Sequence, residues 1–285
     1  MKRAILVVSS LLVLGAIPLF LAYAPFRHLF VGDPQATGAA DKDIQKIDRN
    51  NLPPENTAVD FEDLCRTKPL AAVQESLATY ERTVQTFRCN FVKQEFLNNT
   101  LRPTEKIRCE FREEPFSVTM TWLENPGRAA HMIFVHGENE DQLLAVPASK
   151  TQRFLTGGFV KRSPYDKEVM QAARNPVTKF GIRGMTRGLL EQWDATNGNY
   201  ELNYMGLAEI PELPGRKVHA FHYRPGVPEG EEQITEKKIY FDSEWKILVG
   251  LVLHSNEQLI ARYFYQELEI NPMLPEDTFQ IKRFK

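Results

Sequence analysis

The alternation of apolar and polar residues from Thr86 onward is the dominant pattern in the sequence. Successive side chains of a β-strand point to opposite faces, so such alternation predicts strands with one buried face. The first three runs have their apolar positions at Phe87, Cys89 and Phe91, at Ile107, Cys109 and Phe111, and at Phe116, Val118, Met120 and Trp122. Further candidate strands cover residues 131–136, 142–146, 200–204, 217–223, 237–241, 246–254 and 259–268.

Three segments have a helical period instead. One begins at Pro69, a residue favoured in the first helical turn, and its apolar stripe contains Leu70, Val73, Leu77, Tyr80 and Val84. Two shorter helical patches cover residues 165–174 and 185–193. Closely spaced strands without a βαβ rhythm predict a mainly β fold. We expect a strongly curved antiparallel sheet that forms an unclosed barrel around an apolar core or cavity, with covering α-helices.

The N-terminal residues have the pattern of an export signal. Lys2 and Arg3 precede an uncharged run from Ala4 to Ala24, which is long enough to cross a bilayer as a helix. The basic head predicts that the rest of the chain lies outside the cytoplasm, in the periplasm or cell envelope. Residues 1–32 therefore indicate a signal peptide or a signal anchor, and Pro25, directly after a small-x-small site, disfavours cleavage. A buried helix of a cytoplasmic protein is the remaining alternative.

Composition and charge define the rest of the chain. Residues 33–60 have few large apolar groups and predict a flexible tether, whereas residues 61–285 are expected to form one domain. The net charge of −2 argues against a nucleic-acid-binding protein. Residues 161–188 are locally basic, with seven cations and two carboxylates, a net charge of +5. This run suits either anionic headgroups or an ordinary solvated surface.

Motifs for catalysis, metals or cofactors do not emerge. The sequence has no Gly-x-Ser-x-Gly elbow, phosphate loop or dinucleotide fingerprint. His219 and His222 differ by three positions, so on one strand they point to opposite faces and cannot share a metal. The carboxylate pairs at 113–114, 231–232 and 276–277 fall at turns. We therefore expect a protein that is not an enzyme.

Cys89 and Cys109 are expected to face each other. If the hairpin folds about Asn99, residues whose numbers sum to 198 are partners, and these two cysteines meet that condition. The Cα atoms of a non-hydrogen-bonded antiparallel pair are about 4.5 Å apart, which suits a disulfide, and export permits one. The other interpretation is two reduced core cysteines. Cys65 is left over.

The apolar face of these strands is the candidate ligand site. A curved sheet with a helical cover forms either a filled core or a ligand cavity, and the residue types are the same in both. The candidate lining residues are Phe87, Phe91, Phe111, Met120, Trp122, Phe134, Leu143, Leu189, Leu190 and Leu251.

Several motifs, in this order, resemble the LolA-like group of periplasmic lipoprotein carriers. They are the run 86–95 after an amphipathic helix, Arg112-Glu113-Glu114-Pro115-Phe116 with Trp122, the turn 137–139 before Leu143 and Leu144, and the ending 263–272 with Phe279. The chain is closer still to a family of exported bacterial proteins known only as a domain of unknown function. That family has the paired-cysteine hairpin and the Pro-Phe-Ser-Val strand.

The resemblance implies an unclosed barrel whose helices cover a cavity for acyl chains. In the carriers, an arginine before the proline of the second strand helps hold the helical lid shut, and Arg112 is the matching position. Here Glu113 and Glu114 separate Arg112 from Pro115, unlike the family pattern. We expect a carrier of lipids, acyl chains or lipoproteins. The alternative is an envelope sensor or protein-interaction module tethered by residues 4–24. The sequence does not indicate the oligomeric state.

Overall fold

The computed structural model describes residues 60–284, and these fall in one compact unit. The predicted export segment, residues 1–32, lies outside the described residues, as does the predicted tether except for Asp60. No helix of residues 60–284 combines the length and the apolar character needed to cross a membrane.

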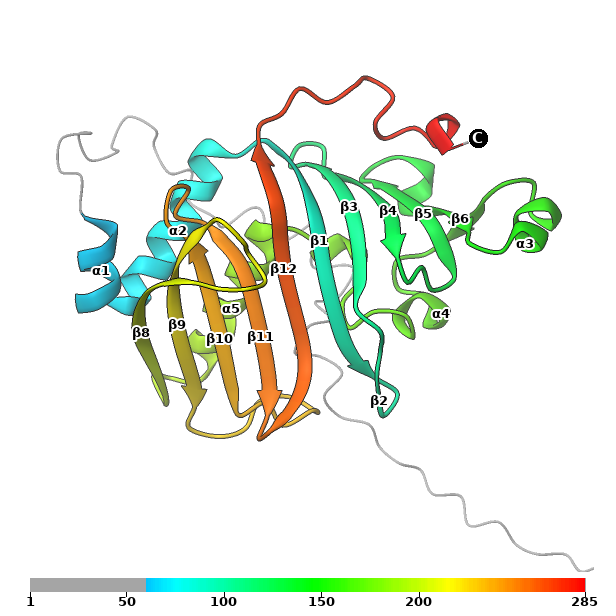
Figure 1. The fold of residues 1–285 in the computed structure, drawn as a ribbon. Helices are drawn as coiled ribbons and strands as arrows, with labels where there is room; N and C mark the ends of the chain where they lie inside the picture. The colour runs from blue at the N-terminus through cyan, green and yellow to red at the C-terminus, as the bar shows by residue number, and fades with distance from the viewer. Residues whose placement is uncertain (1–59, 285) are drawn as a thin grey trace, which may run out of the picture. The chain divides into compact units, whose positions relative to one another are not determined.

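Twelve strands of the described chain form one antiparallel sheet that does not close (Figure 1). The order is β7-β6-β5-β4-β3-β1-β12-β11-β10-β9-β8, with β2 paired to β1, so β7 and β8 are the open edges. The strands are β1 (Thr86–Leu97), β2 (Thr100–Leu101), β3 (Glu105–Arg112), β4 (Ser117–Glu124), β5 (Ala129–Val135), β6 (Leu143–Pro147), β7 (Val160–Arg162), β8 (Tyr200–Glu209), β9 (Lys217–Pro225), β10 (Glu236–Asp242), β11 (Leu248–Ser255) and β12 (Gln258–Ile270). The predicted mainly β, unclosed architecture is confirmed.

The helices match the predictions only in part. The helix from Pro69 is confirmed, and the patch at 185–193 is the centre of a longer helix. The patch at 165–174 contains only one helical turn, because Pro176 and an irregular segment follow it. The helices are α1 (Phe61–Thr67), α2 (Pro69–Thr83), α3 (Lys150–Leu155), α4 (Lys167–Met170) and α5 (Ile182–Ala195), with 3₁₀ turns η3 (Asn139–Asp141), η4 (Val177–Lys179) and η5 (Ile281–Phe284).

The hairpin of β1 and β3 has the predicted register. Cys89 pairs with Cys109, and Phe87 pairs with Phe111. At the tip, Leu97 pairs with Thr100, so these residue numbers sum to 197 rather than 198. One extra residue between Leu101 and Glu105 absorbs the difference, and the two positive-φ residues Asn98 and Asn99 form the tight turn.

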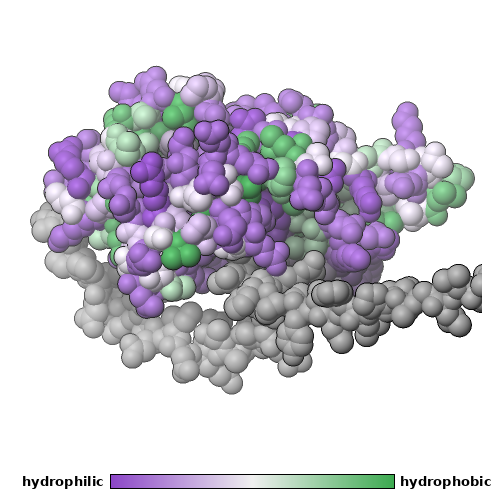
Figure 2. Space-filling view, turned by 90° about the horizontal axis from the view of Figure 1, so that it is seen from below, coloured by the Kyte–Doolittle hydropathy of each residue, from purple (hydrophilic) through white to green (hydrophobic). Residues whose placement is uncertain are grey.

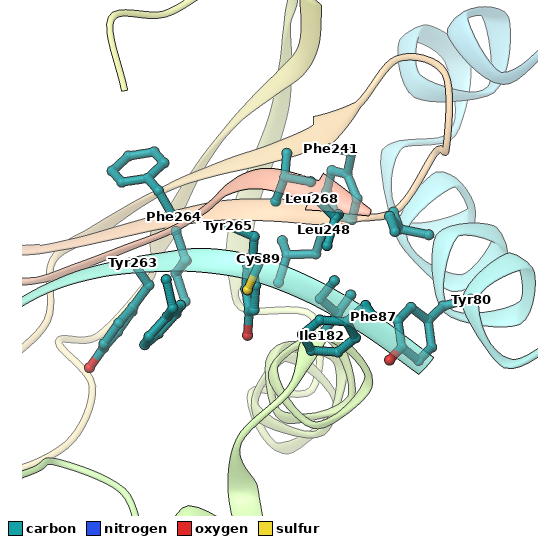
Figure 3. Close-up of a cluster of buried hydrophobic side chains, with 14 of the residues drawn as sticks. Tyr80, Phe87, Cys89, Ile182, Phe241, Leu248, Tyr263, Phe264, Tyr265 and Leu268 are labelled. Carbon is teal, nitrogen blue, oxygen red and sulfur yellow. The ribbon is translucent and has the colours of Figure 1, made fainter. Parts of the chain in front are cut away.

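The inner, concave face of the sheet carries the core. Helix α5 lies behind β10 and β11 in Figure 1, and α2 packs beside it. The buried stripe of α5 contains Ile182, Thr186, Leu189 and Trp193, spaced as one face of a helix. Figure 3 shows Phe87, Cys89, Tyr263 and Tyr265 on the side of the sheet that faces Ile182, whereas Phe264 lies on the other side. The aromatic inner face is therefore enclosed between the sheet and α5.

A β-bulge in β12 changes which residues of this strand point to the inner face. The register with β1 shifts between Arg88 and Asn90, and Glu267 has a positive φ of 49°. Before the bulge Tyr265 pairs with Phe91, and after it Ile270 pairs with Phe87. The bulge thus reverses which positions of β12 point inward.

Candidate functional site

The ten predicted lining residues all belong to one apolar cluster. Eight are buried, and Trp122 and Leu190 are half-buried and pack against the others. The tightest aromatic contact joins Phe87 and Phe111, whose ring centroids are 4.6 Å apart and stacked. Tyr265 extends the cluster, with its ring centroid 5.1 Å from that of Phe91. The fold therefore brings together the ten residues that the sequence predicts to share one apolar face.

Phe180, which the sequence did not single out, fills the centre of this face. It lies just before α5, and its ring centroid is 5.2 Å from that of Phe91, 6.0 Å from that of Phe111 and 6.2 Å from that of Tyr265. Gly181 follows with a φ of 113°, and a Cβ atom there would lie 3.2 Å from the Phe111 ring. A glycine is needed for this close approach. Phe180, Gly181 and helix α5 together form the cover of this face. The cover therefore inserts the aromatic side chain of Phe180 into the apolar face.

Ion pairs attach helix α5 to helix α2 and to the turn after β3. Arg183 lies 2.7 Å from a carboxylate oxygen of Glu113, and Arg187 lies 2.5 Å from one of Glu81 on α2. The Tyr80 hydroxyl donates a hydrogen bond to Glu113 at 2.7 Å. Burial raises the pKa of Glu113, although Tyr80 and Arg183 partly offset it. Glu113 thus joins α2, α5 and the turn after β3.

Arg112 does not make the lid contact expected of it. Its guanidinium donates to the hydroxyl of Ser117 at 2.9 Å and lies 4.8 Å from the ring centroid of Phe279 in the C-terminal segment. Arg112 alternates with Ile107, Cys109 and Phe111 along β3, so its side chain points away from the inner face. In this structure the contact to the helical cover comes from the next residue, Glu113, because one step along an extended chain reverses the direction of the side chain.

A charged cluster lies at the far end of the same inner face. Lys93 is buried and lies 3.2 Å from Glu95 and 3.4 Å from Glu105. Tyr263 donates to Glu95 at 2.7 Å, and the indole of Trp122 donates to Glu105 at 2.5 Å. Burial lowers the pKa of Lys93, but the two carboxylates outweigh it and leave that pKa raised. The sequence contained the signal, since Lys93 and Glu95 have the parity of Phe87 and Phe91.

The segment between β9 and β10 adds two further ion pairs. Glu229 lies 2.6 Å from the buried ammonium of Lys237, which also donates to Gln192 of α5 at 2.6 Å. Glu232 lies 2.6 Å from Arg174, in the stretch that leads to the cover. Burial lowers the pKa of Lys237, and Glu229 opposes this shift. This segment therefore links the open sheet to its cover.

Other side chains do not form a recognisable catalytic or metal centre in the described part of the chain. No group of three or more His, Cys, Asp or Glu residues there is arranged to hold a metal ion. His219 and His222 point to opposite faces, as predicted: His219 contacts Tyr204, and His222 pairs with Glu236. Two hollows of about 310 and 360 Å³ have mainly polar linings, and neither includes a predicted lining residue.

The paired cysteines are buried neighbours across β1 and β3. Cys89 and Cys109 are 2% and 0% exposed, and both thiols are free in this structure. Burial raises the pKa of Cys109, and burial raises that of the separate Cys65 to about 12. The predicted pairing is confirmed, whereas a bond between the two sulfur atoms stays a prediction.

If the chain is exported, as its first 32 residues predict, we expect a disulfide between Cys89 and Cys109. Intact mass after alkylation in denaturant checks this: Cys65 should be labelled without reductant, and two additional alkylations should appear only after reduction, because reduction of one disulfide frees two of the three thiols. Three labelled cysteines without reductant would contradict the bond. The Cys65→Ser variant is the control, and it should show the same two reduction-dependent additions.

The family model for proteins of unknown function DUF1571 matches residues 84–283. The chain belongs to this family. The match spans the described strands from β1 to β12 and confirms the expected domain-of-unknown-function family. No curated protein matches this DUF1571 chain.

Solved structures with low sequence identity are also similar to the DUF1571 chain. MucB in complex with MucA(peri) is 14% identical with a TM-score of 0.41, covering 74% of this chain and 59% of the MucB chain. The lipoprotein LppX of Mycobacterium tuberculosis is 10% identical with a TM-score of 0.41, covering 73% and 99%. A LolA superfamily protein from Nitrosomonas europaea is 8% identical with a TM-score of 0.31, covering 74% and 98%. The present chain thus spans less than two thirds of the MucB chain.

Proposed function

We propose that this DUF1571 protein is an exported, non-enzymatic binder of acyl chains, carrying lipids or lipoproteins in the cell envelope. The observation that supports this most directly is the aromatic inner face under a cover that inserts Phe180. Phe180 is only half-buried although it contacts four aromatic rings. It occupies the place that an apolar ligand would take when the cover moves away.

The cover is suited to movement because of how it is attached. The Arg187–Glu81 pair is exposed, and such a pair contributes only about 0–1 kcal/mol. Arg183 is 38% exposed, although its partner Glu113 is largely buried. The apolar contacts of Phe180 and the α5 stripe therefore supply most of the closing free energy. An acyl chain that replaces the Phe180 contacts restores that burial at roughly 0.8 kcal/mol per methylene.

The inner face has an apolar end and a charged end. Apolar side chains occupy one end, at Phe87 and Phe91, and Lys93 with its two carboxylates occupies the other. An amphiphile has the same two ends. We infer that the acyl chain lies along the aromatic end and that the polar end of the ligand lies toward Lys93.

Purification of the exported protein followed by lipid mass spectrometry tests the proposal. We expect co-purified acyl lipid, and competitive uptake of a fluorescent fatty acid by delipidated protein. An empty protein that also fails to take up the fatty acid would contradict it. That outcome would favour the tethered sensor or protein-interaction module, which needs no acyl ligand. Determining the mature N-terminus by intact mass then shows whether residues 4–24 remain as an anchor.

A further inference from the structure

The loop between β6 and β7 forms an arm with an apolar tip. Its helix α3 lies apart from the other helices, beyond the β7 edge of the sheet (Figure 1). Phe154 and Leu155 at the end of α3 are 86% and 75% exposed. Figure 2 shows hydrophobic residues at the end of the lobe that projects from this side of the molecule. Two adjacent large apolar side chains at this level of exposure are unusual for a surface that meets only water.

The arm has a defined conformation. Ser149 caps α3 by accepting a hydrogen bond from the Gln152 backbone, and Arg153 donates two hydrogen bonds, of 3.1 and 3.3 Å, to the carbonyl of Pro147. Gly157 and Gly158 have φ values of 67° and 108° and return the chain to β7. These contacts hold the apolar tip outward rather than letting it fold back onto the sheet.

The charge of the arm indicates what it contacts. From Gln142 to Tyr165 the chain has four cations and no carboxylate, a net charge of +4: Lys150, Arg153, Lys161 and Arg162. Lys150, Lys161 and Arg162 are exposed. An apolar tip surrounded by cations complements an anionic bilayer surface, where the tip enters the interface and the cations meet lipid phosphates. A protein partner with an acidic rim would fit the cations, but nothing in the structure specifies one.

We propose that the β6–β7 arm, with Phe154 and Leu155 at its tip, docks this protein onto the surface of an anionic phospholipid bilayer. The docking is separate from the proposed acyl-chain site, because no residue of the loop 148–159 belongs to the apolar cluster of the inner face. It also differs from anchoring by residues 4–24. The arm would bring the open edge of the sheet to the membrane whether or not the N-terminal segment remains attached.

A local probe in the full chain tests this, since residues 4–24 are themselves expected to enter vesicles and would mask a simple binding assay. The Phe154→Trp variant is mixed with vesicles of phosphatidylglycerol and phosphatidylcholine that contain brominated acyl chains. The matched control is Met273→Trp, because Met273 is an equally apolar, 96% exposed residue outside the arm. Quenching of the three native tryptophans by the brominated chains is measured on the unmodified protein and subtracted.

We expect at least about threefold stronger quenching at position 154 than at position 273. Each cation near an anionic surface strengthens docking by roughly fivefold, so Lys150→Gln with Lys161→Gln should reduce the quenching, as should pure phosphatidylcholine. Equal quenching at 154 and 273, or none at 154, would overturn the proposal. So would self-association through the tip, seen as a mass by light scattering that falls in Phe154→Ser. Fatty-acid uptake by Phe154→Ser should be unchanged, so failure of either proposal is recognised separately.

Discussion

Replacing Lys93 by methionine is expected to lower the free energy of unfolding by about 3–5 kcal/mol. Methionine retains the length and packing of the side chain but removes the ammonium. Glu95 and Glu105 then face each other on the inner side of the sheet without the cation that lies 3.2 and 3.4 Å from them. An uncompensated buried charge is costly because the protein interior replaces little of its hydration.

Urea unfolding of Lys93→Met and of the double variant Lys93→Met with Glu95→Gln measures this effect. The second change removes one of the two facing carboxylates and should recover roughly half of the loss. Lys106→Met is the matched control, because Lys106 lies on the opposite face of β3 and should change stability by less than about 1 kcal/mol. Equal losses in Lys93→Met and Lys106→Met would show that the buried cluster has no special role.

The Phe180→Ala variant is expected to lose about 2–3 kcal/mol of stability and to bind a fluorescent fatty acid about tenfold more tightly. The stability loss is smaller than for a fully buried phenylalanine because Phe180 is half-buried. The gain in affinity follows because the closed state loses the contacts with Phe91, Phe111 and Tyr265, and the ligand no longer competes with them. Urea unfolding and fatty-acid titration measure the two quantities on the same preparation.

Phe116→Ala provides the matched control for this result. Phe116 is also half-buried and packs on Phe111, with ring centroids 5.2 Å apart, but it precedes β4 rather than belonging to the cover. Its loss should destabilise the protein by a similar amount without a tenfold gain in affinity. If both variants gain affinity equally, general loosening of the core explains the uptake. If neither gains, Phe180 does not compete with the ligand.

Local sequence signals were enough to predict the hairpin of β1 and β3 in detail. Period-two alternation indicates the buried face of Cys89 and Cys109. The turn at Asn98 and Asn99 shows that the two strands pair, and one extra residue after Leu101 then brings the two cysteines into register. The same alternation would have placed Lys93 and Glu95 on the inner face. Residue type alone favours the solvated side for Lys93 and Glu95, and only their parity with Phe87 and Phe91 indicates the inner face.

Long-range features could not be predicted in this way. The pairing of β1 with β12 joins residues about 180 positions apart, and the bulge at Glu267 becomes visible only when the two strands are aligned. Phe180 lies in an irregular segment without periodicity, so its contact with four aromatic rings depends on where α5 packs. The contact with the cover that was predicted for Arg112 is made by the adjacent Glu113, because the turn after β3 decides which side chain reaches Arg183.

The sequence by itself determined ten of the twelve described strands, the helix from Pro69 and the family, because alternation and helical periodicity are local properties of the chain. The short strands β2 and β7 were not predicted, since two and three residues are too few to show a period. Only the tertiary structure decided which residues cover the inner face and which charged residues lie at its end. Contacts such as Glu113 with Arg183, or Lys93 with Glu105, depend on strand order, register and the position of the cover. Burial at those places is set by the whole fold, and the same side chains in isolation would be ordinary surface residues.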